Sequence, residues 1–522
     1  MKVVEITIFC LLATAFTPVT DPVNRMDEEE ITITLDEAIQ IALVNNYMLR
    51  KGALNLEMAD QQIREAWGSV YPQVSASSSY IRNVVSPNPF AGSDAGSLFD
   101  LFGSLEWLSF NEQARTDMDA GTEPITFEEF MDRQQQGMDD AGVSPSGSDN
   151  PFAVDNQFNA GVTVTQTLYN GSAFAAIKGA RQLQEINQDQ FQFEQQQVVD
   201  QIKSAFYGAL LAEEQARVMR SSVERLERTL EETQASVEAG FLSRYDSMSA
   251  EVELVNLETD LIAAENRAEI AIRNLALMLG VPVQTTVHLR GELEIEEKLD
   301  PQTVSLEEAY HLAVQRRPDL NQAEGYLNLL EVNRNITRSG YLPTLNAVAN
   351  AGWVGQVPDN RQVVSQREGD PFSYNTRERG FFDNSYWDPT VSVGLQFQWN
   401  LFDGFQRSSR MQQNKIEIRQ AEIDHEMLEE SVWLEVEQAI RDLETAYQRI
   451  MSQQRNIERA ETNYENALRR LNEGAGTPLE ERQASSLLDQ SRLSYLSAVH
   501  DYLAAKSRFD RVTGKPVAET NP

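Results

Sequence analysis

The sequence contains almost no cysteine: Cys10 is the only thiol among its 522 residues. Cys10 lies in an apolar stretch from Ile6 to Phe16, which follows Lys2 and includes the small residues Ala13 to Ala15. This arrangement predicts a signal peptide over residues 1–20, with a small-residue cleavage site. Its removal would leave a mature chain without thiols, so disulfide bonds are excluded while export from the cytoplasm is compatible with the composition.

Basic residues are also scarce relative to acidic ones. The chain has 44 Lys and Arg against 80 Asp and Glu, which gives a formal net charge of -36. A protein that binds a nucleic-acid backbone must supply cations to displace the counterions of the phosphates. The composition therefore argues against a nucleic-acid partner.

No residue pattern for catalysis or cofactor binding is present. The four histidines, His288, His311, His425 and His500, lie far apart in the sequence and at no spacing typical of metal ligands. The sequence also lacks a P-loop and a glycine-rich nucleotide turn. We therefore predict a protein that is not an enzyme and that has no metal and no cofactor.

Long apolar runs are missing after the predicted signal peptide. A membrane-spanning helix needs about 18 or more mostly apolar residues, and no later segment offers them. If the protein enters a membrane, it must therefore do so as a β-barrel, the other structure that pairs all its backbone groups in lipid.

The most prominent feature that is present is an internal duplication. Thr34 to Ala76 resembles Ser305 to Ala347 at a constant offset of 271 residues. Further along, Leu168 to Gly171 matches Leu401 to Gly404 at an offset of 233. We interpret the two copies as one structural unit that occurs twice, with an insertion of 38 residues in the first copy. Two units of this length are too long and too few for a solenoid.

Each copy contains a long segment with helical periodicity. The first segment, Ala173 to Ala239, has no proline, and the second segment has the same pattern. Mainly apolar positions recur every seven residues, the spacing of a coiled-coil seam. They include Ile202, Ala209, Ala216, Val223 and Leu230 in the first copy and Trp433, Ile440, Tyr447 and Leu468 in the second, where Gln454 and Glu461 are polar interruptions.

A glycine and a returning helix follow each long segment. The returns have their own apolar seams, from Leu254 to Met278 and from Leu488 to Val512, so each copy predicts an antiparallel hairpin. The first long helix would span roughly 100 Å and its return, Ser243 to Leu279, only about 55 Å. A second, shorter helix is needed beside each long one. Residues 36–71 and 307–342 have the required length.

Strands are predicted between these helices. From Val391 to Phe402, apolar and polar residues alternate for about ten residues, which is typical of a membrane strand that faces lipid on one side and water on the other. A weaker alternation occupies the matching position from Ala160 to Leu168, and partner strands begin after Pro72 and Pro343. The predicted lipid-facing residues are Val391, Val393, Leu395, Phe397, Trp399 and Leu401.

Four strands cannot close a barrel, and an open sheet edge is not viable in lipid. We therefore expect several chains to share one barrel. Two chains would supply eight strands, about the number whose interior side chains fill, whereas three or four would leave an open bore. The strand pattern alone leaves these numbers open.

An acidic insertion separates the first two strands. Residues 83–157 contain 14 acidic residues against two arginines, Arg115 and Arg133, and are rich in Gly, Ser, Pro and Asp. Long loops of this kind occur on the outer face of membrane barrels. We predict a solvated acidic loop, because no regular spacing of cation ligands is present.

Taken together, these features resemble the TolC-type outer membrane efflux proteins. The resemblance rests on the repeated starts at Thr34 and Ser305, the prolines before the strands, the turns at Gly171 and Gly404, and the glycine-tipped hairpins. It implies an α+β, mainly α fold: coiled-coil hairpins that form a periplasmic α-barrel, joined to a transmembrane β-barrel of four strands per chain in a trimer. It also implies docking on a periplasmic adaptor protein and an inner-membrane pump of the RND, ABC or MFS type.

The resemblance gives the hairpin tips a role. It implies that an acid six residues after each tip glycine constricts the periplasmic entrance, here Asp246 and Glu480. The family often has a second polar or acidic residue three positions on, here Ser249 and Gln483, and neither is acidic. The residues implied to contact the adaptor are Gly240, Ser243, Arg244, Gly474, Thr477 and Pro478.

The same tip residues also have a purely structural interpretation. Ser243 and Thr477 lie where helix N-caps are expected, and the acids follow three residues later, as in a capping box. Glu480 would complete the usual box and Asp246 a shorter version of it. Gly240 and Gly474 would then end the preceding helices in a left-handed conformation.

The sequence thus predicts a passive, gated exit duct in the outer membrane of a Gram-negative bacterium, with unknown cargo. Two alternatives stay open from the sequence, a periplasmic coiled-coil scaffold and a standalone diffusion porin. The predicted organisation is a first repeat over residues 31–282, a linker over 283–304, a second repeat over 305–516, and a tail over 517–522.

Overall fold

A computed structural model describes residues 30–85, 96–117, 123–143, 154–295, 299–359 and 361–516. The predicted signal peptide and tail lie outside these ranges. The chain divides into two compact units. The helical unit comprises Met1–Ile63, Gly179–Glu331 and Lys415–Pro522, and the strand unit comprises Arg64–Lys178 and Val332–Asn414.

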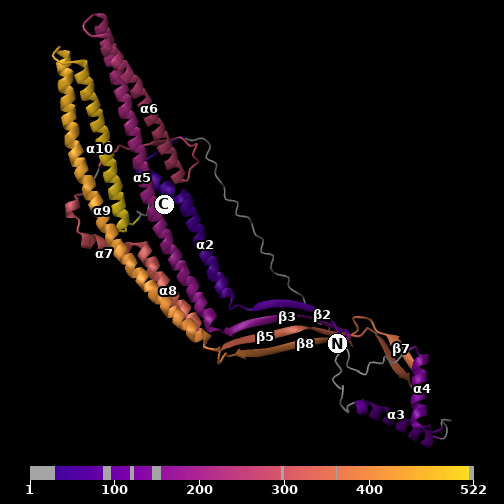
Figure 1. The fold of residues 1–522 in the computed structure, drawn as a ribbon. Coiled ribbons are helices and arrows are strands. Elements are labelled where there is room, and N and C mark those ends of the chain that lie inside the picture. Colours follow the sequence, from indigo (N-terminus) through magenta and orange to yellow (C-terminus); the bar gives the residue numbers. More distant parts are fainter. Residues whose placement is uncertain are drawn as a thin grey trace. The chain divides into compact units, whose positions relative to one another are not determined.

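Two long helices and their returns form the predicted hairpins (Figure 1). Helix α5 (Gly171–Glu238) returns as α6 (Arg244–Leu279), and α9 (Gln406–Asn472) returns as α10 (Pro478–Val512). The middle parts of the heptad seams are buried as predicted, since Ile202, Ala209, Val436 and Leu443 are at most 1% exposed. Near the second tip, the predicted seam residue Leu468 is 37% exposed.

The shorter helices are each broken in two, so the prediction of two continuous helices was wrong. The first copy has α1 (Leu35–Asn45) and α2 (Tyr47–Gly68), and the second has α7 (Leu306–Arg316) and α8 (Pro318–Ser339). The breaks fall at Asn46 and Arg317, which are separated by the offset of the duplication, 271 residues. The break is therefore part of the repeated unit.

Each break has a local cause. Asn46 leaves the helical conformation, and its side chain donates to the Met278 carbonyl at 2.6 Å and accepts from the Met48 N–H at 2.8 Å. In the second copy Arg317 precedes Pro318 and adopts an extended conformation. The proline ring disfavours the helical region for the residue before it. The sequence therefore contained a signal for the second break.

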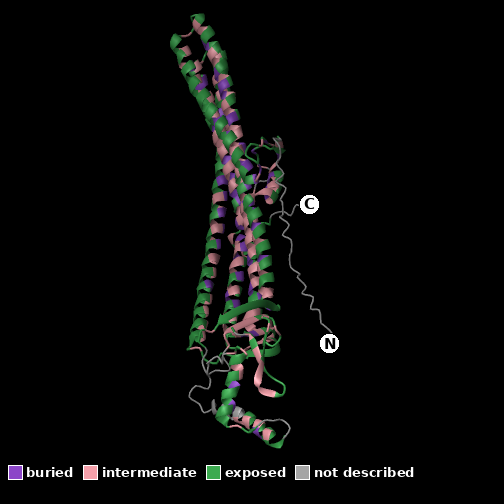
Figure 2. Cartoon of the chain, turned by 90° about the vertical axis from the view of Figure 1, so that its right-hand side faces the viewer, coloured by how far each residue is buried: buried purple, intermediate pink, exposed green. Residues whose placement is uncertain are grey.

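Apolar side chains from both repeats form the core of the helical unit. Figure 2 shows buried residues gathered along the helices. The largest buried cluster joins α5, α6, α9 and α10, through residues that include Phe206, Leu275, Ile450 and Tyr502. The Tyr502 hydroxyl accepts from the Leu299 N–H at 2.8 Å, which satisfies a buried polar group.

The four predicted strands form one antiparallel sheet in the strand unit. Its order is β2 (Gln73–Arg82), β3 (Asn156–Tyr169), β5 (Thr344–Val357) and β8 (Trp387–Gln398). The two repeats meet at the central β3–β5 pairing, where Thr163 lies opposite Asn350. Strands β2 and β8 therefore form the two edges of the sheet within this chain.

Strand β8 has the predicted length but lies four residues earlier than its alternating pattern predicts. It ends at Gln398, so Trp399 and Leu401, which the pattern included in the strand, lie beyond it. The Trp399 indole N–H donates to the Tyr341 carbonyl at 3.1 Å. The remaining predicted lipid-facing residues lie in the strand and are 63–82% exposed: Val391, Val393, Leu395 and Phe397.

The acidic insertion is more ordered than predicted. It contains α3 (Gly96–Thr116) and α4 (Phe127–Asp140), and α4 packs on a hairpin of β6 (Gln362–Arg367) and β7 (Asp370–Glu378). Phe130 of α4 is fully buried against Phe110 and Phe372. The prediction of a purely solvated loop was wrong, because aromatic residues of this insertion and of a second one, between β5 and β8 of the second repeat, form a small core of their own.

The predicted linker between the repeats also contains regular structure. Strand β4 (Val287–Leu289) pairs in parallel with β1 (Ile31–Ile33), and a single 3₁₀ turn, η1, spans Pro301–Thr303. This pairing joins the start of the first repeat to the linker that follows the end of that repeat. No helix in the part of the chain that the structure describes is long and apolar enough to span a membrane.

Candidate functional site at the hairpin tips

Both hairpins turn at a glycine, and the two tips lie at the same end of the helical unit (Figure 1). Gly240 has φ = 81° and Gly474 has φ = 72°, in the left-handed region that side-chain-bearing residues avoid. A Cβ atom at either position would meet nothing within 4 Å. Backbone conformation alone therefore favours glycine here, and the prediction of left-handed helix ends is confirmed.

At the first tip, Ser243 and Asp246 cap helix α6. The Ser243 Oγ accepts from the Tyr245 N–H at 3.1 Å, and the Asp246 Oδ2 accepts from the Ser243 N–H at 3.1 Å. Asp246 thus completes a capping box, and its side chain is half-buried. Its negative charge at the helix N-terminus is also favourable for the helix dipole.

The second tip uses its acid differently. Thr477 Oγ1 accepts from the Glu480 N–H at 3.3 Å, and Pro478 occupies the first turn of α10. The Glu480 carboxylate forms an ion pair with Arg470 of α9 at 3.2 Å, and Arg470 also donates to the Ala475 carbonyl at 3.3 Å. The prediction of a capping box is therefore confirmed for Asp246, whereas Glu480 forms an ion pair that links the two arms of its hairpin and does not complete the predicted box.

The other predicted tip residues surround these caps. Arg244 and Gln483 are exposed, whereas Ser249 is half-buried on α6. The described contacts hold each acid within its own hairpin, and they do not bring Asp246 and Glu480 together.

Large exposed apolar residues at the tips were missed in the sequence. Phe241 directly follows the first tip glycine and is 85% exposed, and Tyr245 is 78% exposed. Met248 and Leu479 are also exposed. Exposed apolar residues that gather in one place often mark a contact surface. The sequence signal was a phenylalanine in a turn, where polar residues are usual.

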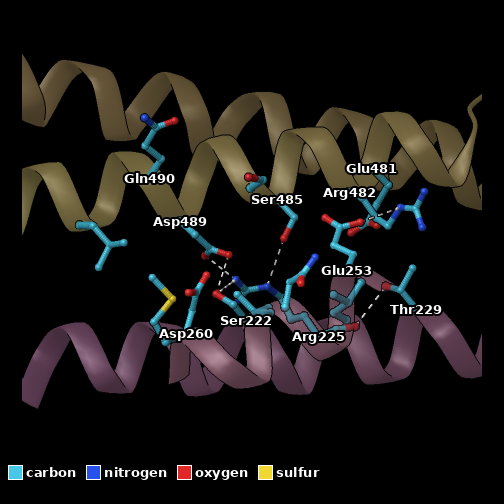
Figure 3. A pocket seen from close by; sticks show the side chains of 16 residues that line it. Ser222, Arg225, Thr229, Glu253, Asp260, Glu481, Arg482, Ser485, Asp489 and Gln490 are labelled. Carbon is cyan, nitrogen blue, oxygen red and sulfur yellow. Dashed lines mark hydrogen bonds and ion pairs between the residues drawn. The ribbon is translucent and has the colours of Figure 1, made fainter. Parts of the chain in front are cut away.

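A network of polar side chains joins the two hairpins (Figure 3). Ser222 Oγ donates to Asp489 Oδ2 at 2.6 Å, and Arg225 donates to the Asp489 carboxylate and to Ser222 Oγ. The Arg225 and Asp489 side chains are only 19% and 13% exposed. This contact couples α5 of the first hairpin to α10 of the second, and no repeat or motif in the sequence indicated it.

A second group of charges lies nearby on α10. Glu481 and Arg482 are 5% and 7% exposed, and Arg482 pairs with Glu253 of α6 at 3.6 Å. Burial raises the pKa of the Glu481 carboxyl, while the positive charges of Arg225 and Arg482 act in the opposite direction. Glu481 is thus a buried acid whose ionised form is disfavoured by its surroundings.

Metal ligands do not gather within the described ranges, where no three His, Cys, Asp or Glu side chains are placed to hold an ion. His500 lies 3.4 Å from an oxygen of its neighbour Asp501, and His425 lies 3.8 Å from Glu429. The chemistry of the tips is therefore that of capped turns, ion pairs and exposed apolar side chains.

The fold and the paired hairpins define a class of protein. The outer membrane efflux protein family matches residues 125–281 and 309–515, most of the chain. The chain belongs to this family, and it is therefore an outer-membrane protein with a channel role in efflux or secretion.

Individual relatives are distant in sequence. The chain is 20% identical to the alkaline protease secretion protein AprF of Pseudomonas aeruginosa, over 68% of this chain and 70% of AprF. It is 21% identical to the outer membrane protein TolC of Escherichia coli, over 67% of each chain.

Similarity in fold extends further than similarity in sequence. The CmeC outer membrane channel of Campylobacter jejuni aligns with a TM-score of 0.66, covering 94% of this chain and 87% of that one at 13% identity. The fold of nearly all of the chain is therefore similar to that of a known channel.

Proposed function

We propose that the protein is the outer-membrane component of a tripartite efflux or type I secretion system. Three copies would share a twelve-stranded barrel in the outer membrane, and their helices would continue it as a duct through the periplasm. The observation that carries this proposal is the four-stranded sheet, which has two unpaired edges and edge strands exposed along their length.

The sheet has the surface of a barrel segment. Along β8 the apolar residues Val391, Val393 and Leu395 alternate with small or polar ones such as Ser392 and Gln396. In lipid, the free N–H and C=O groups of an edge strand each cost several kcal/mol, about the cost of burying an unpaired amide. Pairing β8 of one copy with β2 of the next would remove every open edge. Twelve strands would also leave an open bore.

The hairpin tips would form the periplasmic entrance. Asp246 and Glu480, with Ser249 and Gln483 one turn further on, are the candidate constriction residues. Gating would require a rearrangement of the hairpins at this end. Energy for transport would come from an inner-membrane pump, because the duct itself is passive.

A periplasmic adaptor would dock on the same tips. The predicted contact residues are Gly240, Ser243, Arg244, Gly474, Thr477 and Pro478, and the exposed apolar side chains beside them extend this surface. Phe241 and Tyr245 belong to the first tip and Leu479 to the second, so the two tips would offer different docking surfaces in alternation around the trimer.

The cargo class follows from the partner pump. The name of the family refers to efflux, whereas the name of the Pseudomonas aeruginosa relative refers to protease secretion. Both transport classes use a passive exit duct, and the same architecture serves either.

Conductance through planar bilayers tests the duct and its entrance together. We expect the purified protein to conduct, and trivalent cations added on the tip side to block it. Asp246→Asn should weaken this block about tenfold, the effect of about 1.4 kcal/mol of lost attraction. Ser243→Ala is the matched control: it removes part of the same cap, worth about 1 kcal/mol, but keeps the charge, so the block should be unchanged.

Equal effects of the two substitutions would mean that Asp246 serves only as a cap. A protein that never conducts would contradict the proposed duct as a whole.

A further inference from the structure

A cavity of about 370 Å³ lies between the two hairpins, lined by α5, α6 and α10. All three segments belong to the helical unit. Ligand pockets in proteins begin at about this size, roughly 300 Å³. In Figure 3 side chains of α10 point toward those of α5 and α6 across the cavity. At one end the cavity reaches the second tip, where Glu481 and Arg482 directly follow Glu480, and the rest of it extends along the hairpins away from the tips.

The charges that line the cavity do not balance. Arg225 donates to Asp489, whereas Arg482 forms only a 3.6 Å ion pair with Glu253, and its buried Nε has no hydrogen-bond partner. Glu481 remains as a third carboxylate beside two cations. Asp260 also lines the cavity and is exposed to solvent, which adds to the negative excess.

Glu481 has an unused hydrogen-bond acceptor. The residue is 5% exposed, and its Oε2 is buried without a hydrogen-bond partner. A buried carboxylate oxygen without a partner costs stability, because it has lost its water and gained no donor. A positively charged group that donated a hydrogen bond to this oxygen would satisfy the acceptor. It would also offset the excess of negative charge in the cavity.

Four apolar side chains also line the cavity, beside neutral polar ones such as Ser222, Asn256 and Gln490. Met219, Leu226, Leu257 and Leu493 line the same space. Such a surface favours a ligand with a small hydrocarbon body. An anion is disfavoured, because four carboxylates line the cavity against two guanidinium groups. A bare metal ion is disfavoured too, since no group of three acidic or imidazole ligands occurs among the described residues.

We infer that this cavity binds a small organic cation, an ammonium group on an apolar body, with Glu481 as its counter-ion. The ammonium donates to Glu481 Oε2, and the apolar body contacts the leucine and methionine side chains. Because the walls come from both hairpins, the bound cation strengthens the packing of α10 against α5 and α6. This site is independent of the proposed duct, and its failure would leave that proposal intact.

Binding should depend on pH through Glu481. Burial raises the pKa of this carboxyl, and the cation needs its ionised form, so affinity is full at high pH and falls as pH decreases through the raised pKa. The other titratable or charged groups near it are Arg225 and Glu232 of α5, Tyr464 of α9, Glu253 and Asp260 of α6, and Arg482 and Asp489 of α10.

Calorimetric titration of the full-length protein with benzylamine tests the site. We expect saturable binding that weakens at least tenfold in Glu481→Gln. Benzyl alcohol, which has the same body without the charge, should bind at least tenfold more weakly to the unaltered protein. Glu227→Gln is the matched control: this exposed residue of α5 carries the same charge, does not line the cavity, and its loss should leave binding unchanged.

Folding does not limit this test, because Glu481→Gln removes a charge that burial disfavours and keeps the size of the side chain. Thermal unfolding of Glu481→Gln should therefore match or exceed that of the unaltered protein. Three results would overturn the inference. The first is that Glu481→Gln binds benzylamine as tightly as the unaltered protein, and the second is that the unaltered protein binds benzyl alcohol as tightly as benzylamine. The third is that no saturable binding occurs at all. The last result would mean that the cavity holds only water.

Discussion

Single glycines determine where the long helices turn. Gly474 has a positive φ and open space around it, so only the backbone conformation restricts the residue type. An L-residue in that conformation costs about 1 to 2 kcal/mol. Gly68 lies in the last turn of α2, has no positive φ and also has open space around it. It is a matched control for the loss of a glycine.

We predict that Gly474→Ala destabilises the second tip and that Gly68→Ala does not destabilise its helix. Protection of amide hydrogens around residue 474 should fall roughly fivefold to thirtyfold, the factor that corresponds to about 1 to 2 kcal/mol. Gly68→Ala should leave protection in α2 unchanged or increase it, because alanine favours helix by up to about 1 kcal/mol over glycine. Unchanged protection around residue 474 would contradict the conformational explanation.

For single residues, the sequence predicted the positions of caps and turn glycines more reliably than the contacts of the acidic side chains. The caps at Ser243 and Thr477 and both glycines could be predicted, because helix ends use few residue types. The capping-box role of Asp246 could also be predicted, whereas the Arg470 partner of Glu480 could not. Glutamate is one methylene longer, and Arg470 on the facing helix competes for it. Such competition depends on which residues the hairpin brings together.

The helix breaks are the main features at the scale of elements. Arg317, at the second break, is 5% exposed and donates to both Asp319 and Glu435 of α9. These bonds fix the junction of α7 and α8 to the long helix. Burial disfavours the charge of Arg317, but its hydrogen bonds and ion pairs with the two acids outweigh this and raise its pKa.

We expect Arg317→Met to destabilise the junction by at least about 2 kcal/mol, because removing one partner of a buried ion pair leaves the other acids uncompensated. Arg441→Met is the control on α9, since its side chain is 74% exposed and its pair with Glu437 is worth at most about 0.5 kcal/mol. Thermal unfolding followed by circular dichroism compares the two. Similar losses for both variants would show that Arg317 does not hold the junction.

Element prediction succeeded where one pattern persisted over many residues. Heptad seams gave both hairpins, and alternation gave the four strands of the main sheet. The helices of the acidic insertion were missed because their segment is rich in Gly, Ser, Pro and Asp, which disfavour regular structure. Phe130 and Phe372 come from insertions in different repeats, and the sequence contains no signal that pairs them.

For the whole molecule, the duplication explains the arrangement of the sheet. Each repeat contributes two strands, and the repeats join through β3 and β5. This leaves β2 and β8 as unpaired edges in one chain. The central claim is that these edges pair between copies, so that a sheet that is open in one chain closes in the assembly.

Disulfide trapping between the two edge strands tests this claim most directly. Because Cys10 lies in the predicted signal peptide, the mature chain offers a background without thiols. Ser392→Cys in β8 can be combined in turn with Ser75→Cys, Ser77→Cys or Ser79→Cys in β2. Thr163→Cys with Asn350→Cys is the control, because these residues lie opposite each other within one chain.

We predict that oxidation in outer membranes yields covalent dimers and trimers, and nothing larger, for at least one edge pair, while the control pair stays monomeric. Closure by three copies requires this pattern. If every edge pair stayed monomeric while the control pair formed its internal disulfide, or if a ladder continued beyond the trimer, the account would be contradicted.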